Sequence, residues 1–241
     1  MTTINRIGFV ALLLISSTSV FAQNVNNNSI PEIVKDIEGN VYHTVVVGKQ
    51  VWLQENLRTR KYRNGKAIAS KLTKEQWSKN TTGACAVYEN DSIKESAFGL
   101  LYNWYAVVNP SGLCPAGWHV AKDSEWNKMV KYLDDYSDTT EIKRVQSEIA
   151  GGKMKEIGIT HWATPNTGAT SEANFLAFGG GNRGPNGNFN DVGAYGYWWT
   201  STSSNSAEAY GRLLSYFNSN IDRFKTSKTL GFSVRCIKNA K

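Results

Sequence analysis

Apolar residues recur three or four positions apart in two stretches of the chain, which is the spacing of a helix with one buried face. The first stretch predicts a helix over residues 97–108, which the Asn109-Pro110-Ser111-Gly112 turn ends. The second predicts a helix that starts around Asp123 and ends near Tyr136. The residues that carry the two patterns are Leu100, Leu101, Trp104, Val108, Trp126, Met129, Val130 and Leu133.

Strand patterns dominate both ends of the remaining sequence. Residues 34–42 and 44–53 each predict a hairpin, because tight turns of the Gly39-Asn40 kind suit positive backbone angles. Near the C-terminus, a strand over 195–202 precedes a meander. We expect its strands at 209–217, 220–225 and 231–237, with Phe232, Val234 and Cys236 alternating against their neighbours.

Between these regions the pattern is weaker. Thr73 and Gln76 form a capping box that predicts a short helix over 73–78, and 82–88 predicts a strand. Residues 137–150 have moderate helical character, which Gly151-Gly152 should interrupt. Residues 161–193 are rich in Gly, Asn, Thr and Ser and predict a long irregular loop. Together these segments indicate an α+β fold: a twisted antiparallel sheet, two main helices and long irregular loops.

The N-terminus carries the features of a signal peptide. Arg6 precedes a short apolar core, and Val20-Phe21-Ala22 fits a cleavage site, so residues 1–22 are the predicted signal and 23–33 a flexible leader. The apolar run is shorter than the roughly 20 residues needed to span a bilayer. We therefore expect an exported protein, periplasmic, cell-surface or secreted, that is not membrane-spanning.

The formal charge of +7 narrows the choice of partners only slightly. An exported basic protein can meet an anionic polysaccharide, an acidic envelope or nucleic acid. The densest basic run is Arg58, Arg60, Lys61, Arg63 and Lys66, and we interpret it as a solvated face. We expect no nucleic-acid partner.

The chain has three cysteines, so one is left over if export allows a disulfide. We predict a bridge between Cys114 and Cys236, which in the chain-entropy model is worth on the order of 4–5 kcal/mol. A Cys85–Cys236 bridge is the competing pairing.

No motif indicates catalysis or a cofactor. The three histidines, His43, His119 and His161, are far apart and lack metal-site spacing, and no Gly-x-Ser-x-Gly occurs. Glu125 and Glu156 could form a glycosidase pair, but the likelier role of Glu125 is to cap a helix. Oxygen atoms of a Gly-rich loop could bind calcium, although such residues usually form only a loop. Those residues are Asn186, Asn188, Asn190 and Asp191.

The region 161–195 is nevertheless the best candidate for a ligand site, because long loops in compact domains are usually functional. Its amide and charged side chains can bond to sugar hydroxyls, and an aromatic ring can stack beneath a sugar. For the two aromatic residues, packing in the core is the alternative role. The predicted ligand-binding residues are Trp162, Asn182, Arg183, Asn186, Asn188, Asp191 and Tyr195.

Seven motifs in order resemble one family, the Fibrobacter succinogenes major paralogous domain, over about residues 34–238. Each motif alone is weak, but their order is specific. They are Asp36-x-x-Gly39-Asn40-x-Tyr42, Gln50-Val51-Trp52-x-x-Glu55-Asn56-Leu57, Leu101 to Val107, Gly117-Trp118-His119-Val120, Asn166 to Thr170, Tyr195 to Thr202 and Gly231-Phe232-Ser233-Val234-Arg235-Cys236.

The family is similar in pattern to the C-type-lectin-like fold of formylglycine-generating enzymes, and the resemblance implies that fold here. Those enzymes use two nearby thiols, whereas this chain has one cysteine in the corresponding region, Cys236, so the activity does not carry over. Lys122 stands where a Ser or Thr cap is usual, and Asp123 is the expected substitute. The sequence thus predicts an exported non-catalytic module that binds a glycan or a cell-surface component. The alternatives are an enzyme of formylglycine-generating ancestry and a structural envelope protein.

Overall fold

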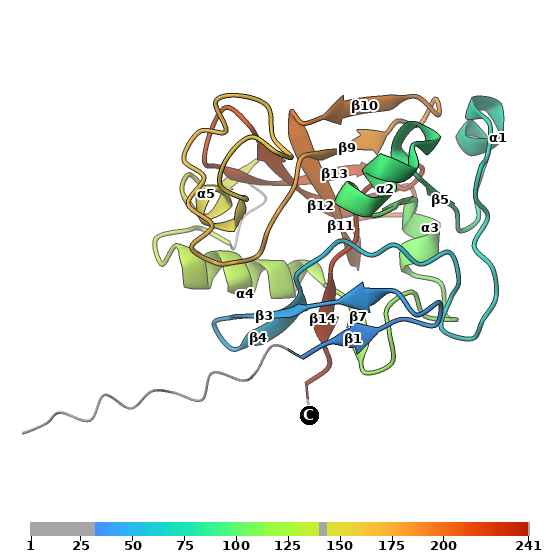
Figure 1. Ribbon diagram of the computed structural model, residues 1–241, viewed down its shortest axis with the longest axis horizontal. Helices are drawn as coiled ribbons and strands as arrows, with labels where there is room; N and C mark the ends of the chain where they lie inside the picture. The colour runs from blue at the N-terminus through green and yellow to red at the C-terminus, as the bar shows by residue number, and fades with distance from the viewer. Residues whose placement is uncertain (1–31, 140–143, 241) are drawn as a thin grey trace, which may run out of the picture. The chain divides into compact units, whose positions relative to one another are not determined.

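The computed structural model describes residues 32–139 and 144–240. The predicted signal peptide and all of the leader before Glu32 lie outside the described residues. The strands form two larger sheets and two short two-stranded ones, and the helices lie between them in the sequence (Figure 1). This arrangement confirms the α+β class.

The largest sheet has six strands in the order β10-β9-β11-β12-β13-β8. All of its pairs are antiparallel except β9 with β11, where Gly196 pairs with Gly181 in parallel. The predicted all-antiparallel sheet is therefore a mixed one. Its strands are β8 (Val145–Ser147), β9 (Gly180–Arg183), β10 (Phe189–Val192), β11 (Tyr195–Ser203), β12 (Glu208–Ser215) and β13 (Ile221–Ser227).

The second sheet brings the two ends of the domain together. Its four strands follow the order β3-β4-β14-β7, so the C-terminal strand lies between the β3–β4 hairpin and a strand from the middle of the chain. The strands are β3 (Thr44–Val47), β4 (Gln50–Leu53), β7 (Trp118–Val120) and β14 (Cys236–Lys238). The two-stranded sheets pair β1 (Val34–Lys35) with β2 (Val41–Tyr42), and β5 (Cys85–Ala86) with β6 (Leu101–Tyr102). Both predicted N-terminal hairpins are confirmed.

The helices are short except for one. The capping box of Thr73 and Gln76 is confirmed at the start of α1. The longest helix, α4, starts at Asp123 as predicted but ends at Leu133, earlier than Tyr136. The helices are α1 (Lys74–Ser78), α2 (Ser92–Phe98), α3 (Trp104–Val107), α4 (Asp123–Leu133) and α5 (Ala150–Met154), with a 3-10 turn at Tyr88–Asn90.

Lys122, not Asp123, occupies the N-cap position of α4. Glu125 accepts a hydrogen bond from the Lys122 amide at 2.7 Å, so its predicted capping role is confirmed. The Asp123 carboxylate is buried and forms ion pairs with Arg212 and Arg223, at 2.8 and 2.6 Å. The proposed cap at Asp123 is therefore wrong, because two guanidinium groups hold that carboxylate.

The predicted helix over 97–108 is also wrong. Gly99, at φ +72°, ends α2, and a Cβ there would lie 2.8 Å from the carbonyl oxygen of Leu57. The chain then forms β6 before α3 begins at Asn103, whose side chain accepts the Ala106 amide at 3.1 Å. Leu100, Leu101 and Trp104 are buried as predicted, although they do not share one helical face, whereas Val108 is exposed.

The region 137–155 differs from its prediction as well. It contains β8 and then α5, in which Gly151 and Gly152 lie inside the helix instead of interrupting it. A Cβ on Gly151 would lie 2.1 Å from the carbonyl oxygen of Asn220, and one on Gly152 would lie 2.2 Å from that of Gly168. The two glycines are needed because backbone segments approach the helix closely.

The predicted irregular loop over 161–193 is irregular only in its first part, because β9 and β10 form a hairpin near its end. The expected C-terminal strand is shorter than 231–237 and belongs to the second sheet, not to the meander. The predicted alternation of buried and exposed side chains over 232–237 does not occur, because all six side chains are buried. Arg235 is fully buried, and its guanidinium donates to Asn56 and to the carbonyl oxygens of Leu53, Phe175 and Leu176.

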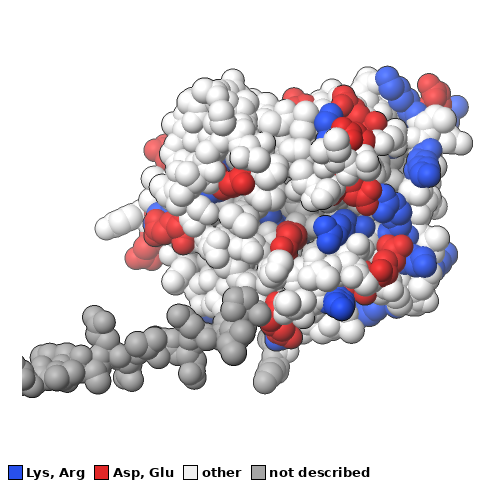
Figure 2. Space-filling view, viewed as in Figure 1, with Lys and Arg blue, Asp and Glu red and all other residues white. Residues whose placement is uncertain are grey.

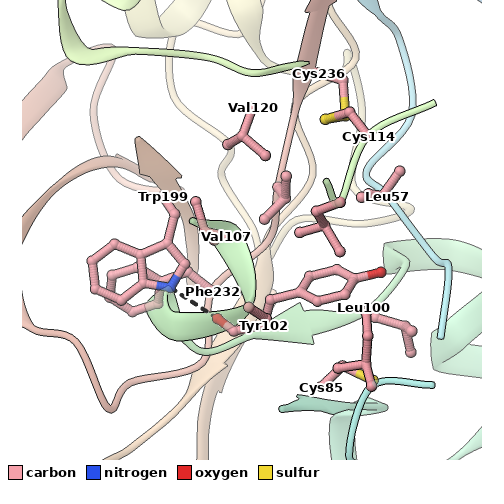
Figure 3. Packing of buried hydrophobic residues seen from close by; sticks show 14 of the residues in the cluster. Leu57, Cys85, Leu100, Tyr102, Val107, Cys114, Val120, Trp199, Phe232 and Cys236 are labelled. Atoms are coloured by element: carbon pink, nitrogen blue, oxygen red, sulfur yellow. Dashed lines mark hydrogen bonds between the residues drawn. A yellow bond between two sulfur atoms is a disulfide. The ribbon is translucent and has the colours of Figure 1, made fainter. Parts of the chain in front are cut away.

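One part of the core surrounds a disulfide. Cys114 and Cys236 are bonded with their Cα atoms 6.0 Å apart, so the predicted pairing is confirmed, and Cys85 is the free and buried thiol. Figure 3 shows these residues with Tyr102, whose carbonyl oxygen accepts a 2.8 Å hydrogen bond from the Trp199 indole. Within this cluster, residues of both larger sheets pack together.

A second part of the core lies against α4. Trp126 contacts Trp52 and Phe175 edge to face, with ring centroids 5.2 and 5.7 Å apart, and it also contacts Trp198. Burial of these large rings supplies much of the hydrophobic stabilisation of the fold. Within the described residues, no helix is both long and apolar enough to cross a membrane.

Candidate functional site

A surface cavity of about 290 Å³ lies where strands β8, β11 and β13 begin and strand β12 ends. We call it the Tyr195 pocket. Its lining combines aromatic, amide and charged side chains, which is the composition expected of a site for a polar ligand. The lining residues are Arg144, Val145, Tyr195, Leu213, Ser215, Phe217, Asn218, Asn220 and Asp222.

Strand register places the pocket residues side by side. Tyr195 pairs with Ser215 across β11 and β12, and Leu213 pairs with Asp222 across β12 and β13. Side chains at positions two apart lie on the same face of a strand, so all four project from one face of the sheet. The same face continues inward to Trp199, where it becomes part of the core.

Two aromatic rings form one wall of the pocket. Tyr195 and Phe217 meet edge to face with centroids 6.0 Å apart, and Tyr195 lies 6.0 Å from Tyr197. Phe217 follows the end of β12 and is 50% exposed, although it is a large apolar residue. An aromatic pair that is held in place but partly open to solvent offers a flat apolar surface to a ligand.

Amide and carboxylate groups face these rings. The Asn218 side-chain oxygen accepts hydrogen bonds from the Ser215 hydroxyl and from the backbone N–H of Asn220, at 2.9 and 3.0 Å. Within the described residues, the side-chain nitrogens of Asn218 and Asn220 donate no hydrogen bond, so they are available to a ligand. Asp222 pairs with the exposed Arg144 at 3.3 Å. Burial raises the pKa of the Asp222 carboxyl group, and the Arg144 guanidinium partly opposes that shift.

A buried lysine holds the loop that carries the amides. The Lys155 ammonium donates to the carbonyl oxygens of Thr167, Ser215 and Asn218, at 2.8, 2.9 and 2.8 Å. Its side chain is fully buried and lies over the Trp162 ring. Burial lowers the pKa of Lys155 to about 8. Because two of its three acceptors belong to pocket residues, Lys155 fixes the backbone that forms this wall.

Of the residues predicted to bind a ligand, only Tyr195 lines the pocket. Trp162 is 2% exposed, and its indole donates to the carbonyl oxygen of Ala177 at 2.9 Å. The ring therefore has no open face for a sugar, and the core-packing alternative holds for this residue. For Tyr195 the structure leaves the ring partly exposed.

Arg183 is also buried and has a structural role. Its guanidinium donates to the carbonyl oxygens of Gly187 and Leu72, at 3.1 and 2.8 Å, and lies 4.4 Å from the Trp77 ring centre. The side chain thereby fastens the β9–β10 hairpin to the start of α1. A buried residue with these partners is not free to contact a ligand, so the structure removes it from the candidate site.

The remaining predicted residues belong to the same hairpin. The Asp191 carboxylate accepts from the buried Asn182 and from the Tyr197 hydroxyl, each at 2.8 Å. Asn186 is exposed and accepts the Asn188 amide within the tight turn. Tyr197 is next to Tyr195 on the same face of β11 and links the hairpin to the pocket wall. Asp191 is thus connected to the pocket only through Tyr197. The turn residues Asn186 and Asn188 do not line the pocket.

Sequence reasoning missed most of the pocket. Phe217, Asn218 and Asn220 are adjacent to the turn after β12, and Asp222 and Arg144 join them only through the pairing of β12, β13 and β8. The one available signal was an aromatic residue directly before an Asn-Ser-Asn turn. The apolar pattern places Phe217 at the end of the predicted strand 209–217, so it does not distinguish this residue from the strand.

The fold does not bring the histidines together. Each one pairs with a different carboxylate: His43 with Glu55, His119 with Glu125 and His161 with Glu156. In residues 32–139 and 144–240, no group of three or more His, Cys, Asp and Glu side chains is arranged to hold a metal ion.

The fold and pocket define a disulfide-bonded α+β domain with a polar surface site. The chain belongs to the Fibrobacter succinogenes major domain family, whose model matches residues 45–238. Neither a curated protein nor a solved structure matches the chain. The family match confirms the resemblance carried by the sequence motifs.

Proposed function

We propose that the protein is an exported, non-catalytic module that binds a glycan of the cell surface or its surroundings through the Tyr195 pocket. The main support for this proposal is that partly exposed aromatic rings, amide donors and a carboxylate line the same cavity. Sugars present alternating hydroxyl groups and apolar ring faces, and such a lining complements both.

The proposal extends to fold and location. We infer a C-type-lectin-like fold from the order of the family motifs, and export from the N-terminal signal pattern. The Cys114–Cys236 bridge is consistent with an oxidising compartment. An enzyme of formylglycine-generating type is less favoured, because the single free thiol, Cys85, is buried and its pKa is raised by burial to about 12.

A binding screen on mature protein, lacking residues 1–22, tests the proposal. The parent protein is applied to neutral and acidic glycans, and each hit is measured again with a Tyr195→Ala/Phe217→Ala double variant. We expect the double variant to lose about tenfold or more in affinity. The control is Tyr132→Ala/Tyr136→Ala, which removes two tyrosines that are 65% and 97% exposed and lie outside the pocket.

Stability must be measured alongside affinity. Because Phe217 is half exposed, its removal should change the thermal midpoint little. A hit that both double variants bind as tightly as the parent places the ligand elsewhere. Absence of any glycan hit favours the third possibility, a structural envelope protein.

A further inference from the structure

Two adjoining cavities beside the disulfide form a groove that is separate from the Tyr195 pocket. Their volumes are about 520 and 270 Å³, and both are lined by Arg63, Leu113 and Cys114. None of the residues that line them belongs to the Tyr195 pocket. We call this pair of cavities the disulfide groove.

Four cationic side chains line the groove: Lys35 and Lys61 on one side, Lys122 on the other, and Arg63 at the junction. Within the described residues, none of their side-chain nitrogens has a carboxylate oxygen within 4 Å or another hydrogen-bond acceptor. By contrast, Arg60, from the same basic run, is paired with Glu95 at 2.6 Å. The four groove cations therefore have charge available for a ligand.

The carboxylates of the groove are already engaged. Asp36 accepts hydrogen bonds from the backbone amides of Glu38 and Asn40, the Asn40 side chain and the Tyr42 hydroxyl, at 2.7–3.0 Å. Glu125 caps α4 and faces His119 at 3.0 Å. Because these carboxylates are held by other groups, they compete little for the groove cations.

Arg63 has a prepared position. Its backbone amide donates to the carbonyl oxygen of Gly112 at 2.8 Å, and its guanidinium lies against Gly112. Gly112 has a φ of +75°, a backbone conformation that favours glycine, and a Cβ there would be 2.5 Å from a guanidinium nitrogen. Next to Arg63, Asn64 bonds to the Ser111 hydroxyl at 2.9 Å. These contacts fix the backbone that carries Arg63, and its exposed side chain lines both cavities.

The floor of the groove is rigid. Leu113 and Cys114 are buried, and the disulfide joins this loop to β14. Figure 2 shows many Lys and Arg side chains, with some carboxylates among them, on the right of the visible face. In Figure 1, which has the same view, the segment between β4 and α1 runs on that side. Lys61 and Arg63 belong to this segment. Cations spaced along an extended cavity suit a chain of repeated negative charges better than a single small anion.

We propose that the disulfide groove is a second binding site, for an acidic polysaccharide that carries carboxylate or sulfate groups. Arg63 is its central contact, since it faces both cavities and its fork of donors matches either anion. Lys35, Lys61 and Lys122 bind neighbouring charges of the same chain. The site acts independently of the glycan proposed for the Tyr195 pocket.

The experiment measures binding of mature protein to polygalacturonate, which carries carboxylates, and to dextran sulfate, with neutral dextran as the reference. An Arg63→Ala/Lys122→Ala variant is compared with a Lys66→Ala/Lys128→Ala variant of equal net charge. Lys66 and Lys128 are exposed neighbours that do not line the groove. We expect the groove variant to lose about tenfold or more in affinity and the control less than about twofold.

Equal losses in both double variants would overturn the proposal, because binding would then depend on net charge alone. Failure of the parent to bind either polyanion above the dextran signal at low salt would also overturn it. The Tyr195→Ala/Phe217→Ala variant should keep its affinity for the polyanions. Conversely, the groove variant should keep any affinity for neutral glycans, so the two sites can fail separately.

Discussion

Replacing both bridged cysteines by alanine, as Cys114→Ala/Cys236→Ala, should remove much of the stability of the domain. The bridge joins residues separated by 122 positions. The chain-entropy model then gives about 16 cal/mol/K for the closed loop, or about 4.9 kcal/mol at 25 °C. Both sulfur atoms are also buried, so the loss of packing adds about 1–2 kcal/mol.

The total, about 6 kcal/mol, is a large fraction of the 5–15 kcal/mol that typically stabilises a domain. Urea unfolding followed by tryptophan fluorescence measures it, since the chain has eight tryptophans. The oxidised parent, the reduced parent and the double variant are compared. The reduced parent should lie close to the double variant, because both lack the cross-link.

Cys85→Ala serves as the control. That thiol is buried but unbridged, so its removal should cost only a packing term of about 1 kcal/mol. A loss below about 1 kcal/mol in the double variant would refute the entropic reasoning, because it would mean that the unfolded chain gains little freedom when the loop opens.

Three further predictions concern other parts of the chain. Lys155→Met leaves three carbonyl oxygens without their donor, of which that of Ser215 is buried, and should destabilise the domain at pH 7 by about 1–3 kcal/mol. Since the native pKa of Lys155 is about 8 and its ordinary value is 10.5, the unfolded chain holds the proton that the native state releases between these values. The free energy of unfolding of the parent, measured by urea titration, should therefore rise relative to that of the variant by up to about 3 kcal/mol between pH 8 and 10.5. A difference between the two proteins that does not change with pH would contradict the argument. Gly152→Ala should destabilise by about 2 kcal/mol or more in the same assay, although helix propensity alone predicts a gain of about 1 kcal/mol, because its Cβ would lie 2.2 Å from the carbonyl oxygen of Gly168. Intact-mass analysis of exported protein should give a chain that begins at Gln23, and retention of residues 1–22 would disprove the predicted signal peptide.

Where local pattern and tertiary packing agree, the sequence predicts the fold well. The first two hairpins, the α1 capping box and the start of α4 depend on contacts between near neighbours, and all are confirmed. The prediction for 97–108 fails because β6 followed by α3 also buries most of its apolar residues, although Val108 is exposed. What decides between the two is the carbonyl oxygen of Leu57, more than 40 positions from Gly99.

The same reasoning explains the candidate site. Tyr195 was identified because it flanks a Gly- and Asn-rich region, but its neighbours in the pocket come from three strands whose pairing the sequence does not specify. Arg183 is predicted to bind a ligand because it is a charged side chain in the same Gly- and Asn-rich region. Two of its three acceptors, the carbonyl oxygens of Leu72 and Thr73, lie about 110 residues earlier, beyond the range of any local pattern.

The position of β14 between β4 and β7 has a consequence for when the domain can form. Until residues 236–238 have been synthesised, the β3–β4 hairpin and β7 lack the strand that joins them, and Cys236 cannot bond to Cys114. Contacts of such long sequence separation also make folding slow. If the protein is exported as we propose, a second sheet that cannot close before β14 is present leaves less folded structure to oppose passage of the chain across a membrane.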